Sequence, residues 1–483
     1  MVFWQTLFSL FIFFLPTQLG WHFWPRYSYV FGLKIDYLSP TLFLTDVLLV
    51  LALIAWWVQR YKQLSRGHST ELSRGPQVEG GRKAKRYKET KIALGVFFFL
   101  LINIFFAQNH WLAFWKSLKV LEIFLLAYLV FKESNLVIKT LERLLPWVVI
   151  YESIISLCQF MKQGSLGGLF WFLGERSFSL MTPMIAKGEF LGRLFLRPYA
   201  TFSHPNSLAG FMLVCLIIIL VKRKFTGIDV AALVLGTITI FLSFSRVVLV
   251  SIFILVPYYF SKVIKIKSDR KIVLAVGLVF IIFFSVLLVN NSSFEESYFQ
   301  RVELNEVAIK LFLRSPIVGI GLNNFIPVMA NQKNFGQVYW LQPVHNIFLL
   351  LIAETGLIGL TLFLILIIKL FRFLSPFAEN LKRKLVDDRE EFSASPGTVR
   401  YLASEEFRSR RRGVLYSTPR SEGRRYPERK PEGASLKTRN IKFLMVTVVI
   451  TLTGLFDHYW LTLQQNLLLL GIVIGVSYFQ KKR

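Results

Sequence analysis

A histidine and an asparagine stand at the start of a long apolar stretch, and they are the strongest candidates for chemistry in this chain. His345 and Asn346 belong to VHNIFLLLIAETGLIGL, residues 344–360. An imidazole changes its protonation near neutral pH, so it can accept a proton from a reacting hydroxyl group. The alternative is that the histidine only hydrogen-bonds the end of a helix. We expect His345 to be catalytic.

Three arginines stand beside apolar stretches and could bind an anion. Arg197 lies in RLFLRPYATFSHPNSLAGF, Arg246 in ITIFLSFSRVVLVSIF and Arg301 in SYFQRVELNEVAIKLFL. A guanidinium donates two parallel hydrogen bonds to phosphate oxygens, which lysine cannot do. Arg246 could instead extend to lipid headgroups, as long basic side chains do at membrane surfaces. We favour an inward-facing anion ligand.

Further polar residues lie at the ends of apolar stretches. Ser203 or Asn206 can cap the helix near Pro205, and a helix N-terminus attracts anions. Asp457 and His458 occur in GLFDHYW, near the C-terminus. A zinc site built from three of the chain's six histidines, His204, His345 and His458, lacks any spaced ligand motif. No D-x-D occurs on the predicted outer side, so the sequence predicts neither a metal nor another cofactor.

Long apolar runs determine the fold class. The chain has 483 residues, 54% of them hydrophobic, and only two cysteines, both inside apolar runs. Runs of about 18 apolar residues cross a bilayer as helices, because lipid offers the backbone no hydrogen-bond partner. We predict an all-α fold, a polytopic transmembrane helix bundle that forms a single integral membrane domain over residues 1–483. About twelve spans are expected, at 2–19, 41–58, 92–107, 111–131, 144–162, 207–221, 228–244, 247–260, 272–290, 344–368, 443–456 and 463–480.

The distribution of basic residues predicts the orientation. With both termini inside, the predicted inner segments hold 43 of the 57 lysines and arginines, and the outer segments hold 11. Such a bias is the positive-inside rule, so the net charge of +28 reflects topology and does not predict nucleic-acid binding. Residues 163–206 and 291–343 then become outer loops that form the site. Residues 65–89 and 377–440 are predicted to be disordered cytoplasmic loops, because they contain few apolar residues.

One outer segment has the pattern of an amphipathic helix. In Ser297–Leu313 the charged residues Glu303, Glu306 and Lys310 lie on one side of the helical wheel. We expect this helix to lie on the outer leaflet, with Arg301 at the edge of the apolar stripe. The stripe on the opposite side consists of Leu304, Val307, Ala308, Leu311 and Phe312.

These motifs together resemble the O-antigen ligase/polymerase superfamily of bacterial membrane glycosyltransferases. The matching pieces are RPYATFSHPNSLAGF, LSFSR, the Arg301 helix with RSPIVGIGLNNF, VHNIFLLLIAETGLIGL and GLFDHYW. They run from about residue 195 to residue 360 and resume near the C-terminus. The chain departs from the pattern in its long basic segment before GLFDHYW. It also has Glu303 and Asn305 where an aromatic residue is expected after Arg301.

The resemblance implies an enzyme on the outer face of the bacterial cytoplasmic (inner) membrane. Such proteins take a glycan from an undecaprenyl-diphosphate carrier and join it to an acceptor hydroxyl, the acceptor being a glycan, a lipid or a protein. The reaction needs no metal, because arginines stabilise the charge that develops on the diphosphate. The residues expected at the site are Arg197, Arg246 and Arg301 for the diphosphate, His345 for catalysis, and Asn206, Asn346, Asp457 and His458 in support.

The competing hypothesis is a transporter or flippase of lipid-linked saccharides. Such a protein would also need many spans and outer basic residues. It would be expected to show paired inverted halves and helices broken near the midplane of the membrane. The sequence shows no internal repeat, so we favour the transferase.

Overall fold

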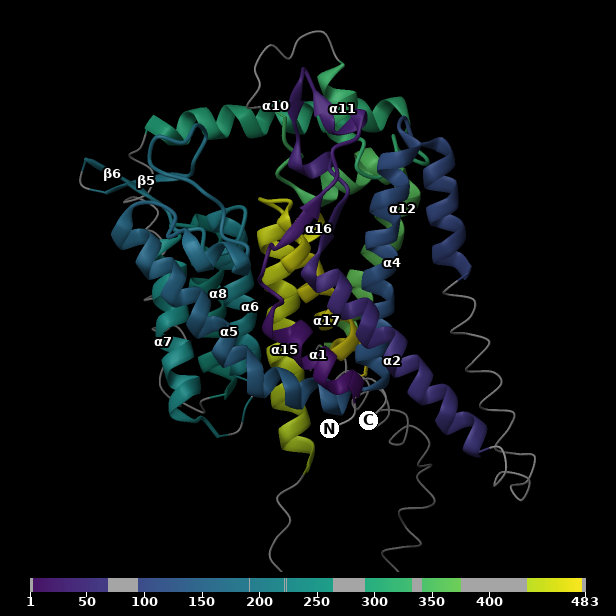
Figure 1. The fold of residues 1–483 in the computed structure, drawn as a ribbon, viewed down its shortest axis with the longest axis vertical. Coiled ribbons are helices and arrows are strands. Elements are labelled where there is room, and N and C mark those ends of the chain that lie inside the picture. The colour runs from purple at the N-terminus through teal and green to yellow at the C-terminus, as the bar shows by residue number, and fades with distance from the viewer. Residues whose placement is uncertain are drawn as a thin grey trace, which may run out of the picture.

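A computed structural model describes residues 3–67, 94–190, 192–220, 222, 224–263, 292–331, 341–374 and 432–479 (Figure 1). The predicted span 272–290 lies outside these residues, as do most of the predicted disordered segments 65–89 and 377–440 and part of the loop 291–343. The described parts of these two segments, residues 65–67 and 432–440, are helical and continue the helices of the neighbouring spans.

Helices make up most of the described chain. Every predicted span except 272–290 overlaps one of them. Three helical segments are long and apolar enough to cross a membrane, Leu44–Gln63, Ser134–Lys162 and Ile347–Phe371, and several shorter apolar helices accompany them. The helices are α1 Phe3–Phe13, α2 Leu44–Gly67, Leu94–Phe106, α4 His110–Lys132, α5 Ser134–Lys162, α6 Pro205–Ile219, α7 Gly227–Leu242, α8 Arg246–Val263, α10 Ser292–Arg314, α11 Phe325–Ala330, α12 Ile347–Leu374, α15 Glu432–Gly454, α16 Tyr459–Thr462 and α17 Gln464–Phe479, with short 3-10 helices at Arg26–Ser28, Asp36–Leu38 and Gly168–Leu173.

Small sheets in the loops accompany the helices of this mostly helical fold. Three two-stranded antiparallel sheets are present among the described residues. Two lie in the segment between α1 and α2, and one lies between α5 and α6. These loops leave the bundle, so their backbone groups pair with one another locally. The paired strands are β1 Gly20–His22 with β4 Thr41–Phe43, β2 Tyr29–Val30 with β3 Leu33–Lys34, and β5 Lys187–Phe190 with β6 Arg193–Leu196.

Helix α6 is the most enclosed helix of the bundle. It contacts α5, α7, α8 and α15, and nearly all of its residues are buried. A helix that is apolar on every side has no water-facing stripe and belongs in the interior of a bundle. The first turn of α6 therefore has a fixed place at one end of the bundle.

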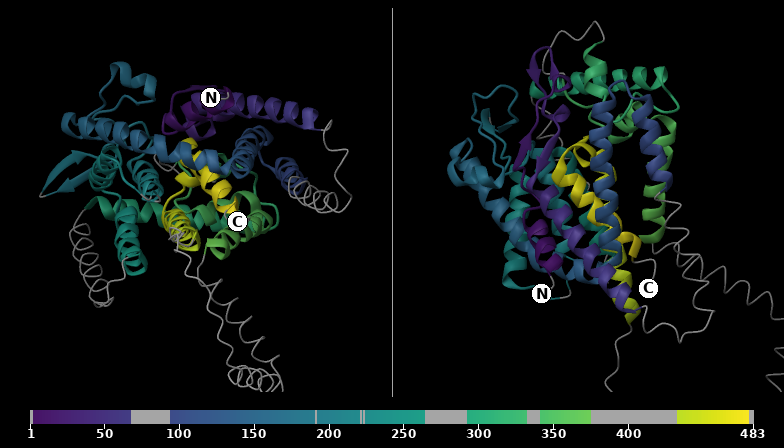
Figure 2. Two further views of the ribbon diagram at one scale, coloured as in Figure 1. Left: turned by 90° about the horizontal axis from the view of Figure 1, so that it is seen from below. Right: turned by 45° about the vertical axis from the view of Figure 1, so that its right-hand side comes forward.

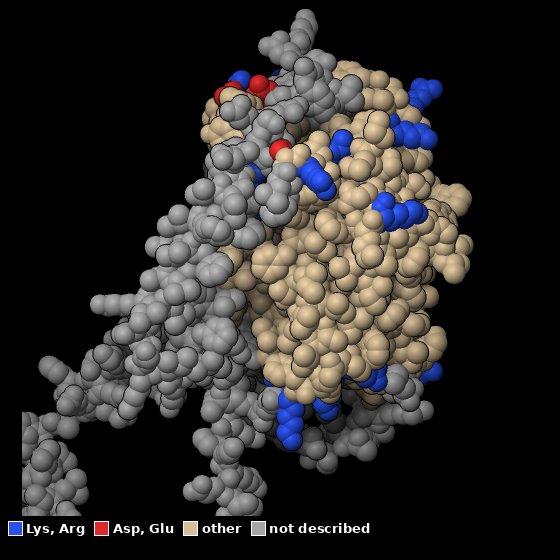
Figure 3. All heavy atoms as spheres, turned by 90° about the vertical axis from the view of Figure 1, so that its left-hand side faces the viewer, with Lys and Arg blue, Asp and Glu red and all other residues tan. Residues whose placement is uncertain are grey.

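The surface charge is consistent with a membrane environment. On the face in Figure 3, lysine and arginine side chains lie toward the two ends of the molecule, and a broad uncharged band lies between them. Large apolar side chains remain exposed on the helices of this bundle, for example Ile238 on α7 and Ile254 on α8. A surface of this kind suits lipid rather than water.

Helix α10 lies across one end of the bundle (Figure 2). Glu303, Glu306 and Lys310 are exposed, as its pattern predicts. The apolar stripe, however, is buried against other parts of the protein. Leu304 and Leu311, for example, belong to one cluster with residues of α11 and α12. The expected contact of this stripe with the outer leaflet is therefore wrong, since the protein itself covers the stripe.

A break in α12 receives the loop that follows α10. Gly356 has a φ of 62°, which interrupts the helix. The amide groups of Leu357 and Ile358 donate to the carbonyl groups of Pro316 and Ile317 at 2.8 and 3.3 Å. These bonds satisfy backbone groups that the break leaves without helical partners.

The carboxylate of Glu354 strengthens the same junction. Oε1 of Glu354 accepts from the amide of Phe325 at 3.3 Å. The backbone carbonyl of Glu354 accepts from the amide of Gly321 at 3.0 Å. The sequence RSPIVGIGLNNF thus binds the upper part of α12, which begins two residues after His345.

We predict that Gly356→Ala destabilises the protein strongly. The positive φ is unfavourable for alanine, and the new Cβ would overlap the backbone carbonyl of Ile317. Strain and overpacking together cost roughly 2–5 kcal/mol. Thermal unfolding of the detergent-purified protein should show a clearly lower Tm.

Gly95→Ala is the matched control, because its Cβ would meet open space within the helix Leu94–Phe106. Its Tm should equal or exceed that of the wild type. Equal Tm values for the two variants would show that the break is not required for stability.

Candidate functional site

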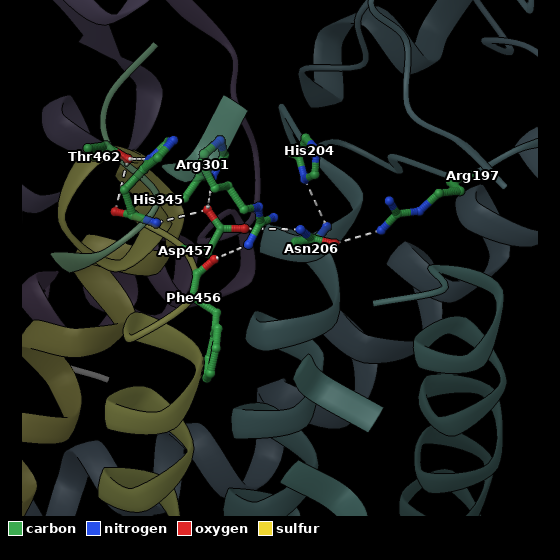
Figure 4. A network of polar contacts seen from close by, with 9 residues as sticks. Arg197, His204, Asn206, Arg301, His345, Phe456, Asp457 and Thr462 are labelled. Carbon is green, nitrogen blue, oxygen red and sulfur yellow. Dashed lines mark hydrogen bonds and ion pairs between the residues drawn. The ribbon is translucent and has the colours of Figure 1, made fainter. Parts of the chain in front are cut away.

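The carboxylate of Asp457 lies at the centre of a polar network at one end of the bundle (Figure 4). It stands in the turn between α15 and α16. Lys116 of α4 fixes α16 by donating to the carbonyl of Leu461 at 2.7 Å. Gly210 of α6 leaves room for Tyr459, the first residue of α16. The turn is thus fixed by α4 and α6.

His345 faces Asp457 from the start of α12. Its Nδ1 lies 3.4 Å from Asp457 Oδ1, and the two side chains are 14% and 9% exposed. An ionised carboxylate can only accept, so the proton of the neutral ring stays on Nδ1 and Nε2 can act as a base. Asn346 caps α12, its Oδ1 accepting from the amides of Phe348 and Leu349 at 2.8 and 3.1 Å. The cap fixes the backbone beside His345.

The first turn of α6 supplies the other side of the network. Asn206 Nδ2 donates to Asp457 Oδ2 at 3.0 Å, and Asn206 Oδ1 accepts from Arg197 Nη2 at 2.6 Å. The backbone amide of Asn206 donates to Nδ1 of His204 at 3.1 Å. The neutral His204 ring therefore carries its proton on Nε2. The same hydrogen bond makes His204 the cap of α6, and the prediction that Ser203 or Asn206 caps it is wrong.

The two remaining arginines come from separate helices. Arg301 of α10 donates from Nη1 to the carbonyl of Phe456 at 2.8 Å, so it reaches the turn that carries Asp457. Arg246 is the first residue of α8 and is half-buried. The charges of Arg197, Arg246 and Arg301 lie close enough to repel one another. The structure thus gathers all three predicted arginines, although they lie far apart in the sequence.

Burial and neighbouring charges determine the protonation of the network. Burial by itself would raise the pKa of Asp457, but the hydrogen bond from His345 and the nearby imidazoles hold this pKa well below its usual range. Burial lowers the pKa of His458 and that of His204 to about 3, although Asp457 opposes both shifts. At neutral pH the network therefore contains an ionised carboxylate and two uncharged imidazoles.

Three of these residues also offer atoms that could hold a metal ion. His345, Asp457 and His458 each have a ligand atom within 4.8 Å of the others. The carboxylate already accepts from Asn206 and from the amide of His458, the latter at 2.8 Å. The predicted zinc alternative also required His204. Its Nδ1 accepts a hydrogen bond, so Nε2 would have to lose its proton to bind a metal.

Some residues near the network carried no signal in the sequence. Thr462 Oγ1 lies 2.7 Å from Nδ1 of His458, and the ring of Tyr37 meets the same imidazole edge-on at 5.5 Å. The carbonyl of Ser243 accepts from Arg197 Nε at 2.6 Å. Tyr37 lies in the first loop, more than 400 positions from His458. The contact of Ser243 is made by its backbone carbonyl, which every residue type has, so the sequence gives no sign of it. Only LSFSR pointed to the turn that contains Ser243.

Comparison with known proteins bears on this geometry. Residues 231–364 match the family model described as O-Antigen ligase. The matched segment begins within α7, ends within α12 and contains Arg246, Arg301 and His345. The chain matches none of the curated proteins with which it was compared. The family match confirms, over these residues, the predicted resemblance to the O-antigen ligase/polymerase superfamily.

Proposed function

We propose that this protein is a membrane glycosyltransferase that joins a glycan from an undecaprenyl-diphosphate donor to an acceptor hydroxyl group. The observation that carries the proposal is the contact of His345 with Asp457 beside three gathered arginines. The match to the O-antigen ligase model supports a role in the synthesis of surface polysaccharides.

The reaction assigns a task to each part of the network. The acceptor oxygen attacks the anomeric carbon of the donor sugar, and the bond between that carbon and the phosphate oxygen breaks. The acceptor proton passes to Nε2 of His345, and the positive charge that forms on the ring is stabilised by Asp457. The electron pair of the broken bond leaves with undecaprenyl diphosphate.

The arginines supply the charge that the leaving group needs. Arg246 and Arg301 repel one another at a half-buried site, so an anion between them would relieve this repulsion. A diphosphate gains negative charge as the sugar leaves, and guanidinium groups already in place stabilise this charge most strongly in the transition state. The proposal needs no metal to bind the diphosphate.

The surroundings of the site are also part of the proposal. The bias of the basic residues supports two cytoplasmic termini and a site on the outer face of the cytoplasmic membrane. The hydroxyl group of a glycan, a lipid or a protein would then reach the site from the outer side. Residues 163–206 and 291–343 supply Arg197, Asn206 and Arg301 to it.

A transporter of lipid-linked saccharides is the second candidate function. The break in α12 at Gly356 favours it, since transporters build their sites on broken helices. Here the backbone of the loop after α10 fills the break, and His345 and Asp457 lie elsewhere in the structure. We therefore favour transfer.

We predict that Arg246→Lys and Arg301→Lys each lower transfer severely although the charge is kept. Lysine cannot donate two parallel hydrogen bonds to phosphate oxygens. Loss of one such donor from a preorganised site lowers kcat by roughly 10²-fold. Initial rates of glycan transfer by the purified variants measure the effect.

Lys310→Ala is the control on α10, because Lys310 is exposed and pairs only loosely with Glu306 at 3.8 Å. Its rate should stay near that of the wild type. Full activity of Arg246→Lys and Arg301→Lys would mean that these arginines only anchor the fold.

We predict that His345→Ala and His345→Gln both lower turnover while donor binding persists. Glutamine keeps a hydrogen-bonding group but is not a base, so it should not rescue activity. Loss of a general base costs roughly 10²–10⁴-fold in rate. Single-turnover rates and donor affinity, measured separately, distinguish catalysis from binding.

A fully active His345→Gln variant would leave His345 only an orienting role. Loss of wild-type activity in a chelator would instead support a metal held by His345, Asp457 and His458.

A further inference from the structure

Arg197 already uses one edge of its guanidinium group within the protein. Nε donates to the carbonyl of Ser243 and Nη2 donates to Asn206 Oδ1, both at 2.6 Å. Nε and Nη2 form the side-on fork with which arginine grips two oxygens of one phosphate. In this structure two different protein segments occupy the fork.

The first of these segments carries Arg246. Ser243 follows the end of α7 and is buried, and its neighbour Phe244 has a φ of 48° in the tight turn. Arg246 begins α8 three residues after Ser243. A hydrogen bond from Arg197 to Ser243 therefore fixes the backbone from which Arg246 extends.

The second segment leads to His345 through one amide group. Because Asn206 Oδ1 accepts from Arg197, its Nδ2 is the group that faces Asp457. If the amide turned over, its oxygen would face the carboxylate and the two acceptors would repel each other. Arg197 thus sets the orientation of the amide, and the amide helps to hold the carboxylate that contacts Nδ1 of His345.

We infer that Arg197 is a positioning residue that aligns Arg246 and, through Asn206 and Asp457, the imidazole of His345. This revises the expectation that Arg197 binds the diphosphate. The catalytic part of the inference rests on the proposed function, but the alignment of His345 is a property of the protein alone. Arg197 remains a cation at neutral pH, since burial lowers its pKa only to about 10.

Nuclear magnetic resonance of the histidine rings tests the alignment without any substrate. The chain has six histidines, so ring-labelled protein in detergent or nanodiscs gives few signals, which single His substitutions assign. Arg197→Lys should shift the ring signals of His345, and Asn206→Ala should do the same. Arg193→Ala on the exposed strand β6 is the control and should leave them unchanged.

Unchanged His345 signals in both Arg197→Lys and Asn206→Ala would overturn the inference. Two variants are used because one substitution could impair folding. A failure of the wild type to bind undecaprenyl diphosphate would count against the proposed function but would leave this test intact.

Kinetics then separate positioning from binding. Arg197→Lys should lower kcat by roughly 10²-fold, the cost of a small misplacement of reacting groups. Its affinity for undecaprenyl diphosphate should stay within about threefold of the wild type, whereas Arg301→Lys should bind at least about tenfold more weakly. Equal loss of affinity in Arg197→Lys and Arg301→Lys would identify Arg197 as a ligand and overturn the inference.

A double-mutant cycle tests the path through Asn206. If Arg197 acts through Asn206, the two single losses should not add, because Asn206→Ala already breaks the path. In the Asn206→Ala background, Arg197→Lys should therefore lower kcat much less than it does alone. Full additivity would show that the two residues act independently.

Discussion

A buried carboxylate is the constraint on which the site depends. Removing a charged group from water costs several kcal/mol unless hydrogen-bond donors replace the lost water. Asp457 meets this cost with donors from three sources, the ring of His345, the side chain of Asn206 and the amide of His458. Asn206 lies in the first turn of α6, His345 precedes α12, and His458 follows Asp457 in the turn after α15, so the carboxylate joins the ends of α6, α12 and α15.

The bundle holds these ends in place by different means. Helix α6 is buried on nearly all sides, and it begins at Pro205. Helix α12 has its N-terminus capped by Asn346, and its break at Gly356 is filled by the loop after α10. The same loop follows the helix that carries Arg301, so one packing arrangement positions both His345 and Arg301.

The positive charges complete this arrangement. Like charges gathered at a half-buried site are unfavourable, and they persist only where the surrounding structure compensates. Asp457 compensates for part of the charge of Arg197. A diphosphate would compensate for the rest, which explains why the site would prefer an anionic donor. Arg301, the proposed ligand, donates from Nη1 to the carbonyl of Phe456, whereas Arg197 donates to the protein from both Nε and Nη2, so the side-on fork of Arg197 is occupied.

Local sequence patterns predicted much of the fold and the residue types of the site. Long apolar runs predicted the helices, because a buried backbone must satisfy its own hydrogen bonds. Polar residues at the ends of these runs, such as His345 and Asp457, marked the site. Whether each helix crosses the membrane stays a prediction.

Tertiary contacts were beyond these patterns. Asn206 and Asp457 are separated by 251 positions, and nothing local shows that they meet. The surface against which the apolar stripe of α10 packs was likewise hidden, because such a stripe fits lipid and protein equally well. The positive φ of Gly356 was also beyond the sequence, because it depends on the loop that fills the break.

The most direct measurement follows the products of a lipid-linked donor in reconstituted membranes. Purified protein in proteoliposomes is given an undecaprenyl-diphosphate-linked oligosaccharide and an oligosaccharide acceptor, with a chelator present. The amounts of released undecaprenyl diphosphate and of extended acceptor are then measured in the same reaction. The account predicts that the two products appear in equal amounts and that Asp457→Ala abolishes both. Movement of the intact glycolipid across the bilayer without any release of undecaprenyl diphosphate would contradict it.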